Sequence, residues 1–142
     1  MSVIDASVWV SRFVPQDAFH ASSQRWLSAH VAAGGLLVSP VILPVEVAGA
    51  VSRRTGDRRL ARQVLDTLMR VPALRIVPID PGLGRAAAEL AADLGLRGAD
   101  AVYVALAREL SLPLLTWDED QRRRAGRVIA ADTPETRDSQ TR

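Results

Sequence analysis

Short apolar runs alternate with longer helical segments along nearly the whole chain. The apolar runs lie at residues 3–4, 36–38, 74–79, 112–116 and 128–130. Between them, apolar residues recur at helical spacing, and we expect Ser39 and Pro40 to open the third helix. Strands that alternate with helices favour an α/β protein with a mostly parallel sheet. Pro78 in the third run predicts an edge strand, because proline cannot donate to a sheet ladder.

The length of 142 residues predicts a single domain. We place this domain at residues 1–130 and expect residues 131–142, which are polar and lack an apolar period, to form a disordered tail. The longest apolar runs are too short to span a bilayer. No basic segment precedes the first strand, so we expect no signal peptide and no membrane association. These features favour a cytoplasmic location.

The basic and sulfur-containing residues exclude several kinds of chemistry. All 18 basic residues are arginines, and cysteine is absent. Without lysine the chain can form neither a P-loop nor a Schiff base. Without cysteine it can form neither a disulfide nor a thiolate metal site. Arginine suits phosphate recognition because its planar fork binds oxygens in pairs, although codon bias in a GC-rich genome explains the same composition.

Four acids lie where a solvated carboxylate is not expected. Asp5 directly follows the first strand, and Asp118 follows the strand at 112–116. Glu46 and Asp100 interrupt apolar stretches near helix starts. An isolated acid in such surroundings is costly unless it is hydrogen-bonded or paired with a cation. Each acid taken alone has a simple alternative explanation as a helix-capping residue.

The four acids taken together favour a metal site. The carboxyl ends of parallel strands share one edge of a sheet, so we expect these acids to converge there. Converging carboxylates repel one another, and they either take up protons or recruit a hard cation. Oxygen ligands suit Mg²⁺ or Mn²⁺, and such a site indicates phosphoryl chemistry with a metal-activated water. His20 and His30 lie apart from the acids, in the second helix, and are expected to play no part.

The segments that contain the acids resemble, in the same order, the four acidic motifs of the PIN-domain nucleases. They are residues 3–7, 44–48, 99–107 and 114–118. The small size is most similar to the VapC-type toxins of toxin–antitoxin pairs, and the resemblance extends to about Ala130. It implies a three-layer α/β/α fold with a mostly parallel five-stranded sheet of order 3-2-1-4-5. It also implies an endoribonuclease that depends on Mg²⁺ or Mn²⁺.

The resemblance also implies roles for individual residues. The acids that it assigns to catalysis are Asp5, Glu46, Asp100 and Asp118, and the three aspartates are the expected metal ligands. Glu46 would position or deprotonate the attacking water, or bind a second metal. Ser7 and Thr116 match hydroxyl positions that support the site in the family. Asp120 is a candidate auxiliary acid, although a solvated helix position is the better explanation.

The expected partners also follow from the resemblance. They are an RNA substrate, a second copy of the chain in a homodimer, and a cognate antitoxin whose C-terminal segment blocks the site from a groove. The aromatic residues that could line this groove are Trp9, Phe13, Phe19 and Trp26, but an ordinary core explains most of them. Arginines at 53–54, 58–59 and 122–124 could contact the RNA backbone or simply be solvated.

Two alternative functions remain at the level of the sequence. One is a PIN-like nuclease for housekeeping RNA processing, which usually carries further domains. The other is a PIN-like module that binds RNA or a partner without cutting, against which the intact set of four acids argues. Phosphate-accepting receivers and haloacid-dehalogenase-like phosphatases also place an acid at a strand end. They normally require a lysine, which this chain lacks.

Overall fold

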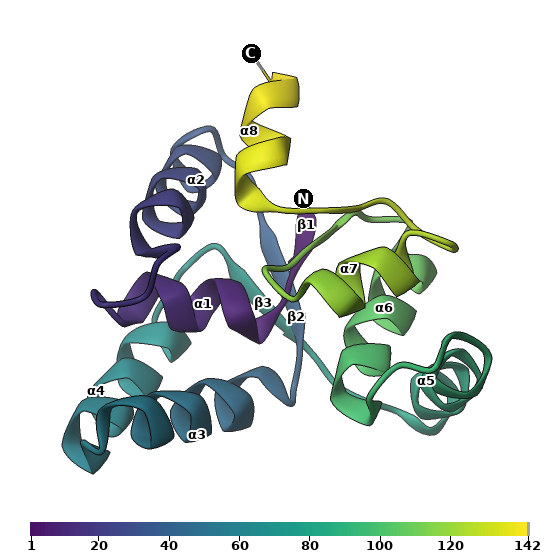
Figure 1. Ribbon diagram of the computed structural model, residues 1–142, viewed down its shortest axis with the longest axis horizontal. Coiled ribbons are helices and arrows are strands. Elements are labelled where there is room, and N and C mark those ends of the chain that lie inside the picture. The colour runs from purple at the N-terminus through teal and green to yellow at the C-terminus, as the bar shows by residue number, and fades with distance from the viewer. Residues whose placement is uncertain (142) are drawn as a thin grey trace.

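The computed structural model describes residues 1–141, in which helices and strands follow one another in the alternation expected from the sequence (Figure 1). The elements are β1 (Ser2–Ile4), α1 (Ala6–Phe13), α2 (His20–Ala32), β2 (Leu37–Pro40), α3 (Leu43–Thr55), α4 (Arg58–Met69), β3 (Leu74–Val77), α5 (Pro81–Leu94), α6 (Gly98–Leu110), β4 (Leu114–Leu115), α7 (Glu119–Ala125), β5 (Ala131–Asp132) and α8 (Pro134–Thr141).

The five strands form one parallel sheet in the order β3-β2-β1-β4-β5, as predicted. β1 is central, because Val3 pairs with Val38 of β2 on one side and with Leu114 of β4 on the other. Helices α1 to α4 lie on one side of the sheet and α5 to α7 on the other (Figure 1). The chain therefore has the three-layer α/β/α architecture. β3 is an edge strand, and Pro78 follows its last residue.

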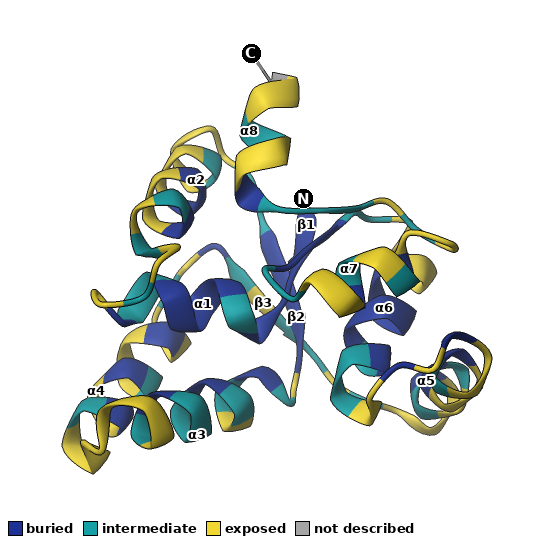
Figure 2. Ribbon diagram, in the orientation of Figure 1, coloured by how far each residue is buried: buried dark blue, intermediate teal, exposed yellow. Residues whose placement is uncertain are grey.

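The core is built on the central strands. Buried residues concentrate in β1, β2 and β4 and in α1 and α6 (Figure 2). Val3, Ile4, Leu114 and Leu115 are completely buried. A parallel sheet that is covered on both faces needs apolar side chains on both sides of each strand, which explains why β1 and β4 are unbroken apolar runs. Residues that directly follow β1 and β4 are therefore attached to strands that are completely buried in the core.

Capping residues set the boundaries of several helices. The Asp80 carboxylate accepts a hydrogen bond from the Leu83 backbone amide at 2.8 Å and begins α5. Asp57 caps α4 in the same way. Gly56 and Gly95 end α3 and α5 in the left-handed conformation, with φ of 67° and 66°, which glycine adopts without a steric penalty. Within the described part of the chain, no helix has the length and apolar character needed to cross a bilayer.

Several strand boundaries differ from the prediction: β3 ends at Val77 instead of residue 79, and β4 is Leu114–Leu115 instead of residues 112–116. Ser39 and Pro40 continue β2 instead of opening α3, because they pair with β3 and the Ser39 hydroxyl donates to the carbonyl of Ile4 at 2.7 Å. The fifth strand is Ala131–Asp132 and not residues 128–130. The preceding residues form a turn instead, in which the Val128 and Ile129 amides donate to the carbonyl of Ala125. The apolar character of residues 128–130 was therefore a misleading signal.

The expectation of a disordered tail is wrong for residues 131–141, which form β5 and α8. Thr133 caps α8 by accepting from the Thr136 amide at 3.1 Å, and the buried Pro134 occupies the first helical position, where its missing N–H costs nothing. α8 packs on α2, and Ser22 donates to Glu135 at 2.7 Å. This helix docks through polar contacts, so it lacks the apolar stripe that would have predicted it. Arg142 lies outside the described residues.

Candidate active site

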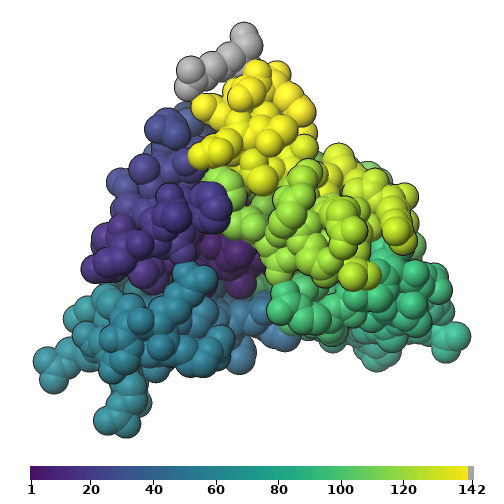
Figure 3. Space-filling model, in the orientation of Figure 1, coloured from purple at the N-terminus to yellow at the C-terminus, as the bar shows by residue number. Residues whose placement is uncertain are grey.

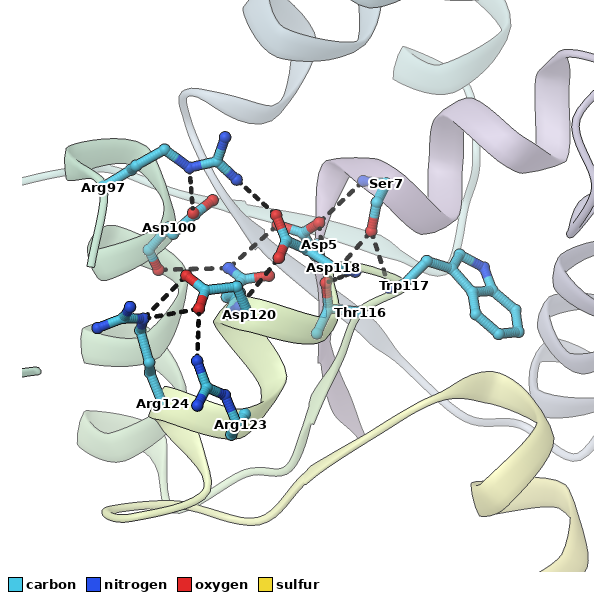
Figure 4. A network of polar contacts seen from close by, with 11 residues as sticks. Asp5, Ser7, Arg97, Asp100, Thr116, Trp117, Asp118, Asp120, Arg123 and Arg124 are labelled. Carbon is cyan, nitrogen blue, oxygen red and sulfur yellow. Dashed lines mark hydrogen bonds and ion pairs between the residues drawn. The ribbon is translucent and has the colours of Figure 1, made fainter. Parts of the chain in front are cut away.

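Asp5 occupies the point where the central strand becomes a helix. β1 ends at Ile4, and the extended backbone of Asp5 lets its carboxylate cap α1 by accepting from the Ser7 amide at 2.9 Å. The same carboxylate accepts from the Thr116 hydroxyl at 3.2 Å and from the Gln121 side-chain amide at 3.3 Å (Figure 4). The residue is only 5% exposed. Three neutral donors therefore compensate for the burial of this acid.

Two hydroxyl groups connect the end of β4 to the start of α1. The Ser7 and Thr116 oxygens lie 3.3 Å apart. The Ser7 hydroxyl accepts from the Trp117 backbone amide at 3.0 Å, and the Thr116 hydroxyl accepts from the Asp118 amide at 3.0 Å. These bonds fix the segment that follows β4 against α1 and set the position of Asp118 relative to Asp5.

Asp118 and Asp100 face each other across one guanidinium group. Asp118 caps α7, and its other carboxylate oxygen accepts from Arg97 at 2.5 Å. Asp100, in the first turn of α6, accepts from the Arg97 Nε at 3.0 Å. Burial raises the pKa of Asp100 above its ordinary value, Arg97 opposes this shift, and the charges of Asp5 and Asp118 add to it. The three carboxylates are therefore close enough to repel one another.

Glu46 approaches the same place from α3. Pro44 stands in the first turn of that helix, and Glu46 lies within the turn as predicted. Its Oε1 atom is buried and has no hydrogen-bond partner among the described residues. Burial raises the pKa of Glu46, the neighbouring Tyr103 hydroxyl and the charge of Arg97 oppose this shift, and the negative charges of Asp5 and Asp100 add to it. The ionised form of Glu46 is therefore disfavoured by its burial and by the neighbouring acids.

All four acids line one open cavity of about 460 Å³. Figure 3 shows the surface hollowed where the N-terminal segment, α3 and α6 meet. The basic residues on the walls of this cavity are Arg53, Arg54 and Arg97. Within residues 1–141, no three acidic or histidine side chains are already arranged to hold one metal ion. The structure therefore brings the four acids to one cavity without closing them around a single point.

Asp120 and the two histidines lie apart from this cavity. The Asp120 carboxylate is exposed and pairs with Arg123 at 3.0 Å and with Arg124 at 2.8 Å, all within α7 (Figure 4). These ion pairs fit a solvated helix position. His20 contacts the Ser11 carbonyl at 2.9 Å, and His30 contacts the Leu36 carbonyl at 3.2 Å. The histidines are satisfied within the fold, as expected from the sequence.

Sequence reasoning missed two residues that contact the acids. Arg97 precedes Asp100 by three positions, a spacing at which helix residues become neighbours, and this spacing was an available signal. Gln121 follows Asp118 by three positions, as in a capping box. Its side chain is fully buried and donates to Asp5 and, at 3.4 Å, to the carbonyl of Asp100. Only the fold reveals that Gln121 turns inward.

The arginine-rich segments differ in how their charges are used. The arginines of α7 pair within their own helix: Arg122 with Glu119, and Arg123 and Arg124 with Asp120. By contrast, Arg58 and Arg59 line a second cavity, of about 780 Å³, at the turn between α3 and α4. They make no ion pair with another described residue up to 141.

Comparison with known proteins identifies the family. The protein-family model of the PIN domain matches residues 2–127 of this chain. No curated protein matches the sequence. Among solved structures, the Mycobacterium tuberculosis toxin VapC20, described as cleaving the sarcin–ricin loop, is 20% identical with a TM-score of 0.70, covering 85% of this chain and 92% of that one. FitAcB from Neisseria gonorrhoeae is 21% identical with a TM-score of 0.72, covering 95% and 99%.

A third similar structure is VapBC2 from Rickettsia felis, bound to a DNA fragment from its promoter. It is 15% identical with a TM-score of 0.70, covering 92% of this chain and 97% of that one. At such identities these likenesses establish the fold, which is that of the VapC toxins, and the family follows from the match over residues 2–127. The chain belongs to the PIN domain family.

Proposed function

We propose that this protein is an endoribonuclease toxin of a toxin–antitoxin pair that depends on Mg²⁺ or Mn²⁺. The observation that carries the proposal is the arrival of Asp5, Glu46, Asp100 and Asp118, from four separate segments, in one cavity of a PIN-domain fold. PIN domains are generally nucleases. The VapC-like fold makes RNA the expected substrate.

The chemistry of the donor set fits a hard divalent cation. The polar groups that the four acids offer are carboxylate oxygens, which Mg²⁺ and Mn²⁺ prefer. Glu46 has a buried oxygen without a partner, and the pKa values of Glu46 and Asp100 are raised by burial and by the neighbouring acids. A cation would relieve both costs. We assign Asp5, Asp100 and Asp118 as its ligands, held after small side-chain movements from the arrangement described above.

When bound, the metal would lower the pKa of a water molecule that it ligates, and it would place positive charge beside the scissile phosphate. The chain supplies the rest. Glu46 positions the attacking water and accepts its proton, a task for which a raised pKa is suitable because an efficient base titrates near the working pH. Ser7, Thr116 and Gln121 hold Asp5 in one orientation through its three hydrogen bonds. The exposed guanidinium groups on the cavity walls bind the RNA backbone.

The α3–α4 turn extends this basic surface. Arg53 and Arg54 line the acidic cavity, and Arg58 and Arg59 follow after the Gly56 turn. Among residues 1–141, Arg53, Arg58 and Arg59 make no ion pair, so their charges are available to phosphates. Arg54 pairs with Asp17 at 2.5 Å, and the α7 arginines pair with acids of their own helix. We therefore propose that RNA reaches the cavity along α3 and α4.

The partners are proposed from the similar structures. A Klebsiella pneumoniae structure described as a toxin–antitoxin complex and VapBC-5 from Mycobacterium tuberculosis have TM-scores of 0.60 and 0.58 with this chain. We propose that this chain likewise binds a cognate antitoxin. The homodimer is proposed from the family resemblance. Phe19 lies at the start of α2 and is 40% exposed. Its ring stacks on that of Trp117, with 4.0 Å between the ring centroids. We propose that such a partner contacts the chain here.

The test compares cleavage of labelled RNA by the wild type, Asp5→Asn and Asp100→Asn, with Asp93→Asn as a matched control on the exposed face of α5. We expect the wild type and the control to cut in Mg²⁺ or Mn²⁺ and to stop in excess chelator. The two site variants should remain folded and lose at least 100-fold in rate. The proposed mechanism would be refuted if the wild type cut RNA as fast in chelator as in metal, or if Asp5→Asn cut as fast as the wild type.

A further inference from the structure

One cationic side chain lies directly between two of the acids in the cavity. The Arg97 guanidinium donates through Nε to Asp100 Oδ2 at 3.0 Å and through Nη2 to Asp118 Oδ2 at 2.5 Å (Figure 4). Asp100 lies on α6 and Asp118 caps α7, so this single group bridges two elements. Asp5, by contrast, is held by neutral donors.

The position of Arg97 follows from its place in the chain. It is the N-cap of α6, two residues after the left-handed Gly95 that ends α5. Its side chain is 74% exposed, whereas those of Asp100 and Asp118 are 15% and 26% exposed. The guanidinium is therefore anchored at the rim of the cavity and can leave the acids by rotating its side chain into solvent, without moving α6.

We propose that Arg97 is a resident counter-cation that the divalent metal displaces. The inference rests on the proposed function, because Asp100 and Asp118 are among the assigned metal ligands. The guanidinium occupies one oxygen of each of two carboxylates that we assign to the metal, so the two cations would compete for the same pair of acids. Two cations cannot share those oxygens without strong repulsion. Arg97 therefore keeps the acids close together before the metal arrives, and it weakens the affinity of the site for the metal.

The first test measures the affinity for Mn²⁺ by isothermal titration calorimetry. Arg97→Gln removes the bridging cation, and Arg53→Gln is the matched control, because Arg53 lines the same cavity but makes no ion pair with an acid among residues 1–141. We expect Arg97→Gln to bind Mn²⁺ about three- to tenfold more tightly than the wild type, a change of the size that ion pairs of this exposure carry. Arg53→Gln should change the affinity less than twofold.

The second test follows Arg97 itself. In NMR spectra of the arginine Nε–H groups, the Arg97 signal is assigned as the one absent from Arg97→Gln. Titration with Mg²⁺ should move this signal to the position of a solvated arginine, with the same midpoint as metal binding. In chelator, Arg97→Gln should melt at a lower temperature than the wild type, because the acids lose their counter-charge, and it should gain more from added Mg²⁺.

Several outcomes would overturn the inference. An Arg97 signal unchanged at saturating Mg²⁺ would show that the guanidinium stays on the acids. Equal Mn²⁺ affinity in the wild type and Arg97→Gln, together with weaker RNA binding by the variant, would assign Arg97 to substrate contact alone. Either result leaves the proposed nuclease function intact. Absence of Mn²⁺ binding to the wild type would overturn both the inference and the proposed metal site.

Discussion

Replacing Glu46 by glutamine is expected to stabilise the metal-free protein. The Glu46 Oε1 atom is buried without a hydrogen-bond partner in the described chain, and burial, followed by the charges of Asp5 and Asp100, raises the pKa of this acid. Glutamine has the same size and carries no charge. The substitution therefore removes the repulsion and the cost of burying an anion, while it leaves the shape of the cavity nearly unchanged.

The magnitude follows from two opposing contributions. A buried polar group that lacks a partner costs about 1–3 kcal/mol, and glutamine retains part of that cost. An acid in the first turn of a helix is favoured by about 0.3–1 kcal/mol, and this benefit is lost. We expect a net gain of about 1 kcal/mol in the free energy of unfolding. For a chain of 142 residues this gain corresponds to about 3 °C in the melting temperature.

The gain must depend on pH in one direction. Because the pKa of Glu46 is higher in the folded state than in the unfolded state, ionisation destabilises the folded wild type. Below the ordinary glutamate pKa of about 4.3 the group is protonated in both states, and the difference between glutamate and glutamine vanishes. The gain should grow as the pH rises above this value and level off above the folded-state pKa.

The assay is urea and thermal unfolding in excess chelator from pH 4 to 8, with Glu89→Gln as the control. Glu89 is exposed on α5, where it pairs with Arg85, and its replacement should change stability by less than about 0.5 kcal/mol. A loss of stability for Glu46→Gln at pH 7, or a gain that does not change with pH, would refute the electrostatic reasoning. Cleavage of RNA should fall in the same variant.

Two further substitutions test the support of the site and the path of the RNA. Gln121→Leu removes the amide that donates to Asp5. Metal affinity or cleavage should fall about 10- to 100-fold with the fold retained, as for other residues that orient a metal ligand. Unchanged kinetics would show that Asp5 needs no such support. The double variant Arg58→Gln/Arg59→Gln should weaken binding of single-stranded RNA and reduce the slope of log K against log salt by about 1.4. Arg123→Gln, whose charge is paired within α7, is its control, and equal effects of the two variants would contradict the proposed path.

Much of the fold could be predicted because its signals are local. The apolar run before Asp5, the cap at Asp80 and the glycine that ends α5 each act over a few residues. The position of β5 and the existence of α8 escaped prediction because they depend on contacts with distant parts of the chain. β5 exists only by pairing with β4, and α8 docks on α2 through polar groups.

The acids of the site could be proposed from the sequence because each interrupts an apolar segment or ends a strand. Their arrival in one cavity follows from the parallel sheet, which places the ends of β1 and β4 side by side. Arg97 and Gln121 could not be assigned in the same way. The direction of a long side chain depends on tertiary packing. The Arg97–Asp118 and Gln121–Asp5 contacts join residues that are distant in the sequence and are brought together by the fold.

The central position of β1 determines when the cavity can first exist during synthesis. The N-terminal strand emerges first, yet one of its two neighbours, β4, comes from the last third of the chain, and Asp118 lies beyond that strand. A nascent chain that ends before Thr116 lacks both the Thr116 hydroxyl that contacts Asp5 and the last of the four acids. A ribosome making this protein therefore carries no assembled acidic cavity until translation of the domain is nearly complete.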